Sequence, residues 1–325
     1  MNYHLKKTIL SYGEMLWDIL FLGYRVERKL PTETVLGGAP CNFAYRANSL
    51  GDRGIIASRL GKDDLGKKAF EQLSSLGLET TYIQWDDSHP TGTVPVTFDD
   101  SNNPNFTIIP DVAYDYIEMT DHLRDIASVS DCLCFGTVSQ RSERSRQTLE
   151  LILEISKSLK LLDINLRKDC YSPDTVIRSL EKADILKLNE NELYEIAKML
   201  GIRYSNPAQI CEHVMNSYSL RYCVVTLGEK GVFGISDKDE HVYDAGYEVA
   251  LADSVGAGDA FSAGFAHHIL RGKTLAESCM FGNILGAIVC TKKGATATVT
   301  EEEIEEFKSR DLKRIHKCFF YLNFL

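Results

Sequence analysis

The chain lacks several features that would assign it to a specialised class of protein. Its 325 residues contain no long basic run, and 36 Lys and Arg against 46 Asp and Glu give a net charge of −10. Such a balance disfavours nucleic acid and anionic lipid as partners. The apolar segment 8–24 is interrupted by Glu14 and Asp18, and no small-residue cleavage site follows it. We therefore expect a cytoplasmic protein with a small-molecule ligand.

Patterns for metal binding and disulfide formation are missing as well. The nine cysteines are scattered singly apart from Cys132 and Cys134, without zinc-ligand spacing or a dense disulfide framework. His267 and His268 are adjacent on a predicted helix and point to different faces, so they do not predict a metal pair.

Two common nucleotide-binding signatures also fail. No Gly-x-Gly-x-x-Gly follows the first predicted strand, which disfavours a dinucleotide oxidoreductase. The run 61–68 comes near a phosphate-binding loop, but Lys68 replaces the hydroxyl residue, and Asp63 and Asp64 would repel a phosphate. A phosphate site has to be sought elsewhere.

The remaining pattern is an alternation of strands and helices. Hydrophobic residues make up 44% and charged residues 25% of the chain, as in an ordinary globular enzyme. Strand-like runs are predicted at 8–12, 54–58, 132–135, 161–164, 185–188 and 222–226, and helices near 40–50, 62–76, 143–159, 190–200, 257–270, 275–290 and 301–307. This rhythm predicts a mainly parallel sheet covered on both faces, with ligands bound beyond the carboxyl ends of its strands.

Two regions break this alternation. Residues 16–36 and 91–110 are rich in Thr, Val, Phe and Asn with prolines, which favours short antiparallel strands in a small β appendage or lid. The predicted core then comprises residues 1–15, 37–90 and 111–325. The apolar end 318–325 fits a packed segment, a partner contact and a disordered remnant equally well.

The most informative segment is Asp253–Phe261, which reads Asp-Ser-Val-Gly-Ala-Gly-Asp-Ala-Phe. Gly256 and Gly258 lack a Cβ, so the backbone can turn tightly and bring several N–H groups to a phosphate oxygen at a helix start. Asp259 is an anion beside this anion site, and the simplest role for it is to accept the proton of an attacking alcohol. An ordinary strand-to-helix turn would look the same, so other motifs must decide.

A second glycine turn, Gly37-Gly38-Ala39-Pro40-Cys41-Asn42, also precedes a predicted helix, and taken alone it favours a structural role. Further motifs are Gly61–Gly66, Asp163–Arg167, Asn189–Glu192 and Thr226–Gly231. In order and spacing, these motifs together resemble the ribokinase or PfkB family of carbohydrate kinases. The resemblance runs from Gly13 to about Thr298.

Within that family the chain is most similar to the fructokinases. The similarity lies in Gly13–Asp18, the Gly-Gly-Ala-Pro-x-Asn turn and Gly136–Arg141, and Ala39 and Pro40 depart from the usual ribokinase turn. The resemblance implies a three-layer α/β/α fold with a β lid and an ATP-dependent sugar kinase, with D-fructose ranked first. Ribose, another sugar, a sugar acid or a nucleoside stays open as the acceptor. A non-catalytic binding regulator on the same fold is the alternative of another class.

The resemblance also implies residue roles on the acceptor side. Asp259 would be the base, and Gly256, Ala257 and Gly258 would offer N–H groups to the transferring phosphoryl group. Asp18, Gly38 and Asn42 are expected to contact sugar hydroxyls. Arg167 and Lys187 are candidate phosphate contacts, Arg167 on the substrate side and Lys187 with the nucleotide. The alternative for Asp18 is a solvated strand residue, and that for Arg167 is a surface charge. Lys187 could instead be a lysine with a buried stem whose ammonium reaches the surface.

On the nucleotide side, Asn189 and Glu192 match an Asn-x-x-Glu that the family links to Mg²⁺ and its waters, although an asparagine here also caps a helix well. Thr226, Gly228 and Gly231 would border the nucleotide, with Asn283 near the adenine. Asp253 and the stretch Cys290–Thr298 resemble a monovalent-cation site, which adds K⁺ to the expected cofactors. Family members often pair through the lid, so a homodimer is also expected.

Overall fold

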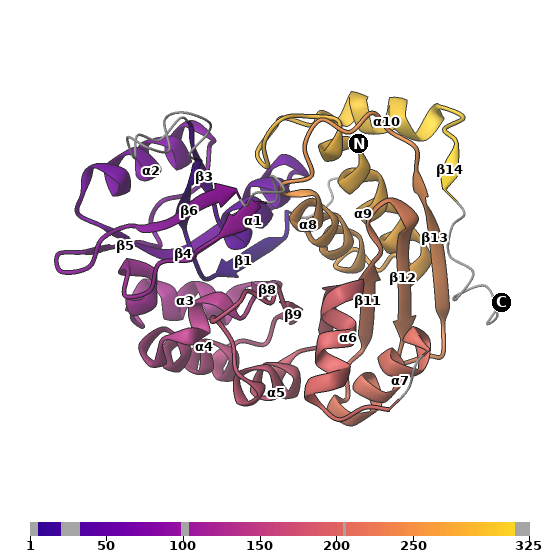
Figure 1. The fold of residues 1–325 in the computed structure, drawn as a ribbon, viewed down its shortest axis with the longest axis horizontal. Coiled ribbons are helices and arrows are strands. Elements are labelled where there is room, and N and C mark those ends of the chain that lie inside the picture. Colours follow the sequence, from indigo (N-terminus) through magenta and orange to yellow (C-terminus); the bar gives the residue numbers. More distant parts are fainter. Residues whose placement is uncertain (1–5, 21–32, 99–103, 204–205, 316–325) are drawn as a thin grey trace.

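A ten-stranded sheet forms the centre of the protein, whose computed structural model describes residues 6–20, 33–98, 104–203 and 206–315 (Figure 1). Its strands are β1 (Thr8–Tyr12), β4 (Arg53–Gly61), β5 (Ile83–Asp86), β8 (Cys132–Phe135), β9 (Leu159–Asp163), β10 (Ile185–Asn189), β11 (Tyr222–Thr226), β12 (Gly231–Ser236), β13 (His241–Tyr247) and β14 (Arg314–Ile315). They lie in the order β14-β13-β12-β11-β10-β9-β8-β1-β4-β5. Pairing is parallel from β11 to β5 and antiparallel from β11 to β14.

Helices cover both faces of this sheet. One face carries α1 (Ala39–Ser49), α2 (Asp64–Ser75), α8 (Ala257–Ile269), α9 (Leu275–Cys290) and α10 (Glu301–Ser309), and the other carries α3 (Asp121–Val129), α4 (Glu143–Ile155), α5 (Pro173–Lys182), α6 (Glu190–Met199) and α7 (Pro207–Tyr218). Successive strand residues serve opposite faces: Ile9 packs into the α1 and α8 side, whereas Leu10 and Tyr12 pack into the α3 to α7 side. The predicted three-layer fold is confirmed.

A second, four-stranded sheet lies beside the large one. Its strands are β2 (Leu16–Leu20), β3 (Glu33–Gly37), β6 (Gly92–Phe98) and β7 (Pro104–Phe106), in the order β3-β2-β6-β7. The β2–β3 and β6–β7 pairs are antiparallel as predicted, but β2 and β6 pair in parallel, so the expectation of antiparallel strands is wrong for this pair. The chain returns through the core between β2 and β6, and such a crossover, unlike a hairpin, permits a parallel pair.

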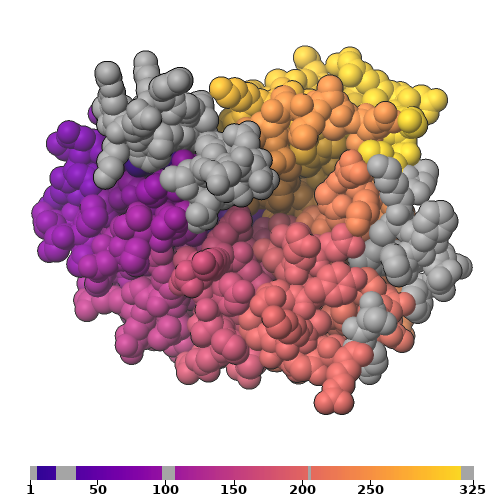
Figure 2. Space-filling view, in the orientation of Figure 1, coloured from indigo at the N-terminus to yellow at the C-terminus, as the bar shows by residue number. Residues whose placement is uncertain are grey.

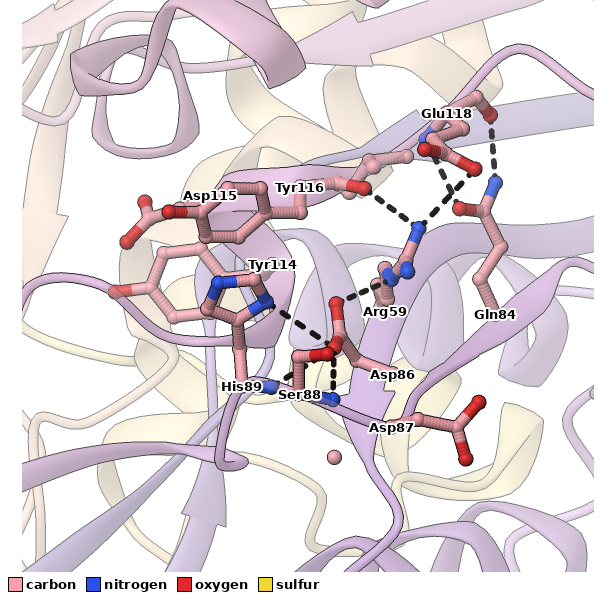
Figure 3. A network of polar contacts seen from close by, with 12 residues as sticks. Arg59, Gln84, Asp86, Asp87, Ser88, His89, Tyr114, Asp115, Tyr116 and Glu118 are labelled. Atoms are coloured by element: carbon pink, nitrogen blue, oxygen red, sulfur yellow. Dashed lines mark hydrogen bonds and ion pairs between the residues drawn. The ribbon is translucent and has the colours of Figure 1, made fainter.

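A polar network fixes the junction between the two sheets (Figure 3). The carboxylate of Asp86, at the end of β5, forms an ion pair of 2.8 Å with Arg59 and accepts hydrogen bonds from the backbone and ring nitrogens of His89. Arg59 also donates to the backbone oxygen of Tyr116 and pairs with Glu118, and the rings of His89 and Tyr116 stack 3.6 Å apart. The start of the β5 to β6 connection is thereby attached to the core.

Asp63 supplies a second attachment to the small sheet. It is the N-cap of α2 and accepts from the backbone of Gly66, and it also accepts from the backbone and hydroxyl of Thr91, just before β6. Of the two acidic residues that disfavoured a phosphate-binding loop, Asp63 caps α2 and Asp64 is the first residue of that helix. The predicted apolar end 318–325 lies outside the described residues. No helix in the described part of the chain combines the length and apolar character needed to cross a bilayer.

Candidate active site

The predicted base lies in the first turn of α8, close to a glycine with a left-handed backbone conformation. Gly256 is the N-cap and has a φ of 79°, and a Cβ at this position would lie 2.4 Å from the Cβ of Ala295. Only glycine fits both the backbone angle and the contact. Asp259 follows three residues later, at the end of the helix where exposed N–H groups and the helix dipole favour negative charge.

Asp259 is held by an amide and by surrounding charges. The Nδ2 of Asn42, in α1, donates to Oδ2 of Asp259 at 2.8 Å. Burial raises the pKa of Asp259 to about 6 and Asp163 acts in the same direction, while Asn42, Lys187 and Arg167 oppose the rise. The carboxylate is therefore ionised at neutral pH but more basic than an ordinary aspartate, which suits a general base.

A buried ion pair lies under the glycine turn. The ammonium of Lys187, on β10, donates to both carboxylate oxygens of Asp163 at 3.1 Å, and the hydroxyl of Ser262 donates to one of them at 2.7 Å. Burial lowers the pKa of Lys187, but Asp163, Glu192 and Asp259 outweigh burial and the pKa lies above its ordinary value. Because a Cβ on Gly258 would lie only 3.1 Å from this ammonium, the lysine supports the turn with a positive charge.

Sequence reasoning assigned no role to Asp163. The signal that could have found it is its place at the carboxyl end of a buried parallel strand, where ligand-binding groups gather.

A second carboxyl group, Glu14, was also missed. It lies just after β1, is only 4% exposed, and lines a small cavity together with Asn165 and Asp259. Burial raises its pKa to about 7, and Asp259 adds to the rise, whereas Arg167 and nearby backbone amides oppose it. The sequence signal that could have found Glu14 is a charged residue that closely follows an apolar strand.

The predicted sugar contacts converge on the same region. Gly38 is the N-cap of α1 with a φ of 114°, and a Cβ there would lie 2.5 Å from the backbone oxygen of Glu14. Asp18, on β2, is half-buried, and burial raises its pKa while Arg167 lowers it. Arg167 is exposed on the loop after β9, and its charge also acts on Glu14 and Asp259. Asp18 of the small sheet and the base Asp259 thus both respond to the charge of Arg167.

A cavity of about 830 Å³ opens on the other side of the turn. Its lining includes the predicted nucleotide residues Asn189, Thr226, Gly228, Gly231 and Asn283, together with Ala257 and Gly258. The volume is in the range of small-molecule and cofactor sites. In Figure 2 the C-terminal third of the chain, which supplies most of this lining, lies opposite the N-terminal third, which supplies the small sheet. Lys187, predicted with the nucleotide group, lies under Gly258 and is not part of the lining.

Both carboxylate oxygens of Glu192 accept hydrogen bonds from backbone amides. One carboxylate oxygen accepts from the N–H of Asn189 at 2.8 Å and the other from that of Leu166 at 2.9 Å, while Asn189 Oδ1 accepts from the N–H of Glu192. This is the helix cap that the sequence offered as an alternative to a metal role.

Asp253 is engaged in the same way. Its two carboxylate oxygens accept from the N–H groups of Val255 and Gly294, both at 3.0 Å. Across the described ranges, no three His, Cys, Asp or Glu side chains gather in a way that could hold a metal ion. The metal roles of Glu192, through the waters of Mg²⁺, and of Asp253, toward a monovalent cation, stay predictions.

Comparisons with known proteins identify the family of the chain. The model of the pfkB family of carbohydrate kinases matches residues 6–302. The chain is 30% identical over 317 residues to a putative sugar kinase of Pyrococcus horikoshii, covering 92% of this chain and 95% of that protein. It is 28% identical over 330 residues to a probable fructokinase-3 of Arabidopsis thaliana, covering 95% and 93%. The crystal structure of the P. horikoshii sugar kinase in complex with ATP matches with a TM-score of 0.75 at 28% identity, covering 92% of this chain and 99% of that one. The chain belongs to the pfkB family of carbohydrate kinases.

Proposed function

We propose that this sugar kinase transfers the γ-phosphoryl group of ATP to a primary hydroxyl, with D-fructose as the first acceptor to test and fructose 6-phosphate as its product. The observation that carries the proposal is the position of Asp259. Its carboxylate has a pKa of about 6 and accepts a hydrogen bond from Asn42, and it directly follows Ala257 and Gly258, which line the large cavity. The fructokinase relative and the ATP complex of the P. horikoshii protein support the choice of substrates.

In this mechanism Asp259 accepts the proton of the sugar hydroxyl as the hydroxyl oxygen bonds to the γ-phosphorus. The bond from that phosphorus to the bridging oxygen breaks, and ADP leaves. Asn42 keeps the carboxylate ionised and oriented, and the first amides of α8 face the charge on the phosphoryl oxygens. The small sheet would close over the sugar and exclude water, which the same base could otherwise activate.

Mg²⁺ belongs to the proposal as the companion of ATP: it would offset the charge of the phosphates, and Asn189 and Glu192 would hold it through its waters. No step requires Glu192 or Asp253 as a direct ligand. Removal of Mg²⁺ with a chelator should abolish turnover. A requirement for K⁺ would appear as faster turnover in K⁺ than in Na⁺ at equal ionic strength.

The decisive experiment combines an acceptor panel with one variant. Wild-type protein is assayed for ADP release with fructose, ribose, a sugar acid and a nucleoside, and Asp259→Asn is assayed with the best of them. Loss of a general base should lower kcat by about 10²–10⁴-fold while ATP still binds. Near-normal turnover by Asp259→Asn would refute the role of the base. A clear nucleoside preference would discard fructose, and phosphorylation of any acceptor would exclude a silent regulator.

Pairing of two chains through the edges of the small sheet stays a prediction. Strands β3 and β7 are the edges of that sheet among the described residues. Light scattering at micromolar concentration should give twice the monomer mass if the pairing occurs. The cytoplasm stays the predicted compartment.

A further inference from the structure

The C-terminal strand contributes to the proposed nucleotide cavity. Lys313, Arg314 and Ile315 are among the lining residues, although the family model ends at residue 302. Strand β14 pairs with β13 through Arg314 opposite Tyr247, and the N–H of Glu248 donates to the backbone oxygen of Lys313 at 2.9 Å. The wall of the cavity therefore includes residues that lie beyond the matched kinase domain.

Arg314 is fixed at this wall by two contacts. Its guanidinium forms an ion pair with Asp244 on β13, and its central carbon lies 3.8 Å from the centre of the Tyr247 ring. The two charged side chains are only 27% and 18% exposed. A partly buried, charge-assisted pair of this kind is stronger than an exposed one and holds its geometry better.

Asp244 in turn fixes the amide of Asn283. The Nδ2 of Asn283 donates to Oδ2 of Asp244 at 2.6 Å and to the backbone oxygen of Ala245 at 2.9 Å. An amide nitrogen has two hydrogens, so both are used and the amide cannot flip without losing them. The side-chain oxygen of Asn283 accepts no hydrogen bond from the described residues, and Asn283 lines the cavity. A carbonyl acceptor is thereby left for a ligand.

We propose that Arg314 is a positioning residue for nucleobase selection, acting through Asp244 to keep the amide oxygen of Asn283 available to the nucleotide. That oxygen accepts a hydrogen bond from the exocyclic amino group of adenine. Guanine has a carbonyl oxygen at the corresponding ring position, which would put two acceptors against each other. The site would therefore select ATP over GTP. This inference rests on the proposed ATP-dependent function.

The test measures binding directly, so it does not depend on the identity of the sugar. Calorimetric titrations with ATP and with GTP compare wild type, Arg314→Ala and Arg314→Lys. The matched control is Arg178→Ala, which removes an exposed arginine paired with Asp174 on α5 at 2.9 Å. Loss of one oriented hydrogen bond should weaken ATP binding by about three- to tenfold. Because the freed amide can also turn its N–H₂ to the base, the ratio of GTP to ATP dissociation constants should fall by at least about tenfold.

Arg314→Lys keeps the charge and should recover part of the preference, and Arg178→Ala should match wild type. At saturating ATP, kcat of Arg314→Ala should change by less than about threefold, because the base is untouched. An unchanged ATP preference in folded Arg314→Ala would overturn the inference. If that variant does not fold, Asp244→Asn decides by the same criterion. If the wild-type protein binds ATP and GTP equally, the inference on base selection is refuted and the proposed function stands. If it binds neither nucleotide, the proposed function is refuted as well.

Discussion

The hydrogen bond from Asn42 to Asp259 makes a quantitative prediction about pH. If Asp259 is the base, kcat/KM should be constant near neutral pH and fall tenfold per unit as the pH drops through about 6, where the carboxylate becomes protonated. An ordinary aspartate would keep activity down to a pH of about 4. The raised pKa therefore moves the loss of activity upward in pH.

Asn42→Leu removes the donor and keeps a side chain of similar size. A hydrogen bond of 2.8 Å to an ionised group contributes about 1.5–3 kcal/mol, and one pKa unit corresponds to about 1.4 kcal/mol. Since the bond favours the charged form, its loss should raise the pKa of Asp259 by about one to two units. The acid limb of kcat/KM should then be centred at a pH of about 7 to 8. Any loss of sugar contact lowers the plateau but does not move this midpoint.

The assay quantifies ADP directly from pH 5 to 9, which avoids the pH dependence of coupling enzymes. The matched control is Asn48→Leu, which removes an amide of the same helix that donates only to the backbone oxygen of Gly77. Its profile should coincide with wild type. Because Glu14 has a pKa of about 7 and shares the cavity, the comparison is repeated in a Glu14→Gln background, where one titrating group is removed. A midpoint that stays in place, or moves to lower pH, on removal of Asn42 would refute the assignment.

Three further variants test the support of the site. Gly256→Ala should lower both kcat and the melting temperature, because its Cβ would collide with Ala295 and its positive φ costs about 1–2 kcal/mol. Lys187→Met should leave Asp163 as an uncompensated buried charge, lowering the free energy of unfolding by about 3–5 kcal/mol and reducing activity more at pH 7 than at pH 8.5. Asp52→Asn should cost about 3 kcal/mol in urea unfolding at pH 7, because this buried carboxylate holds His267 in the last turn of α8 and Arg271 just after that helix. The pKa of Asp52 lies below its ordinary value, since its hydrogen bonds outweigh burial, so the difference from wild type should shrink as the pH falls below about 4.

The sequence predicted the core strands well because burial on both faces makes them short, continuous apolar runs. Strands β1, β8 and β11 have the predicted bounds. Helices α5 and α7 were not predicted, although Ser172-Pro173 and Asn206-Pro207 mark their starts as capping residues followed by proline. The direction of the β2–β6 pair could not be read from the chain, because it depends on the path through the core between them.

For the site, the motifs led to Asp259 and to the residues that line the large cavity, because glycine turns and carboxylates can be recognised in a short stretch of sequence. The groups that surround Asp259 could not be predicted in this way. Its pKa depends on burial and on Asp163, which ends strand β9 far away in the sequence, and the part played by Glu14 depends on the approach of α1. Such contacts between distant segments exist only after the chain has folded.

Glu192 has a consequence for how kinetic data on this enzyme are interpreted. Its one carboxylate fastens the first turn of α6, where Asn189 faces the large cavity, and also the loop that leads from Leu166 to Arg167 near the base. Occupants of the two neighbouring compartments therefore share a single anchor, and any energetic coupling between them must be equal in both directions. Substitution of Glu192 should therefore change the Michaelis constants for both substrates together, and a change in only one of them would contradict the shared anchor.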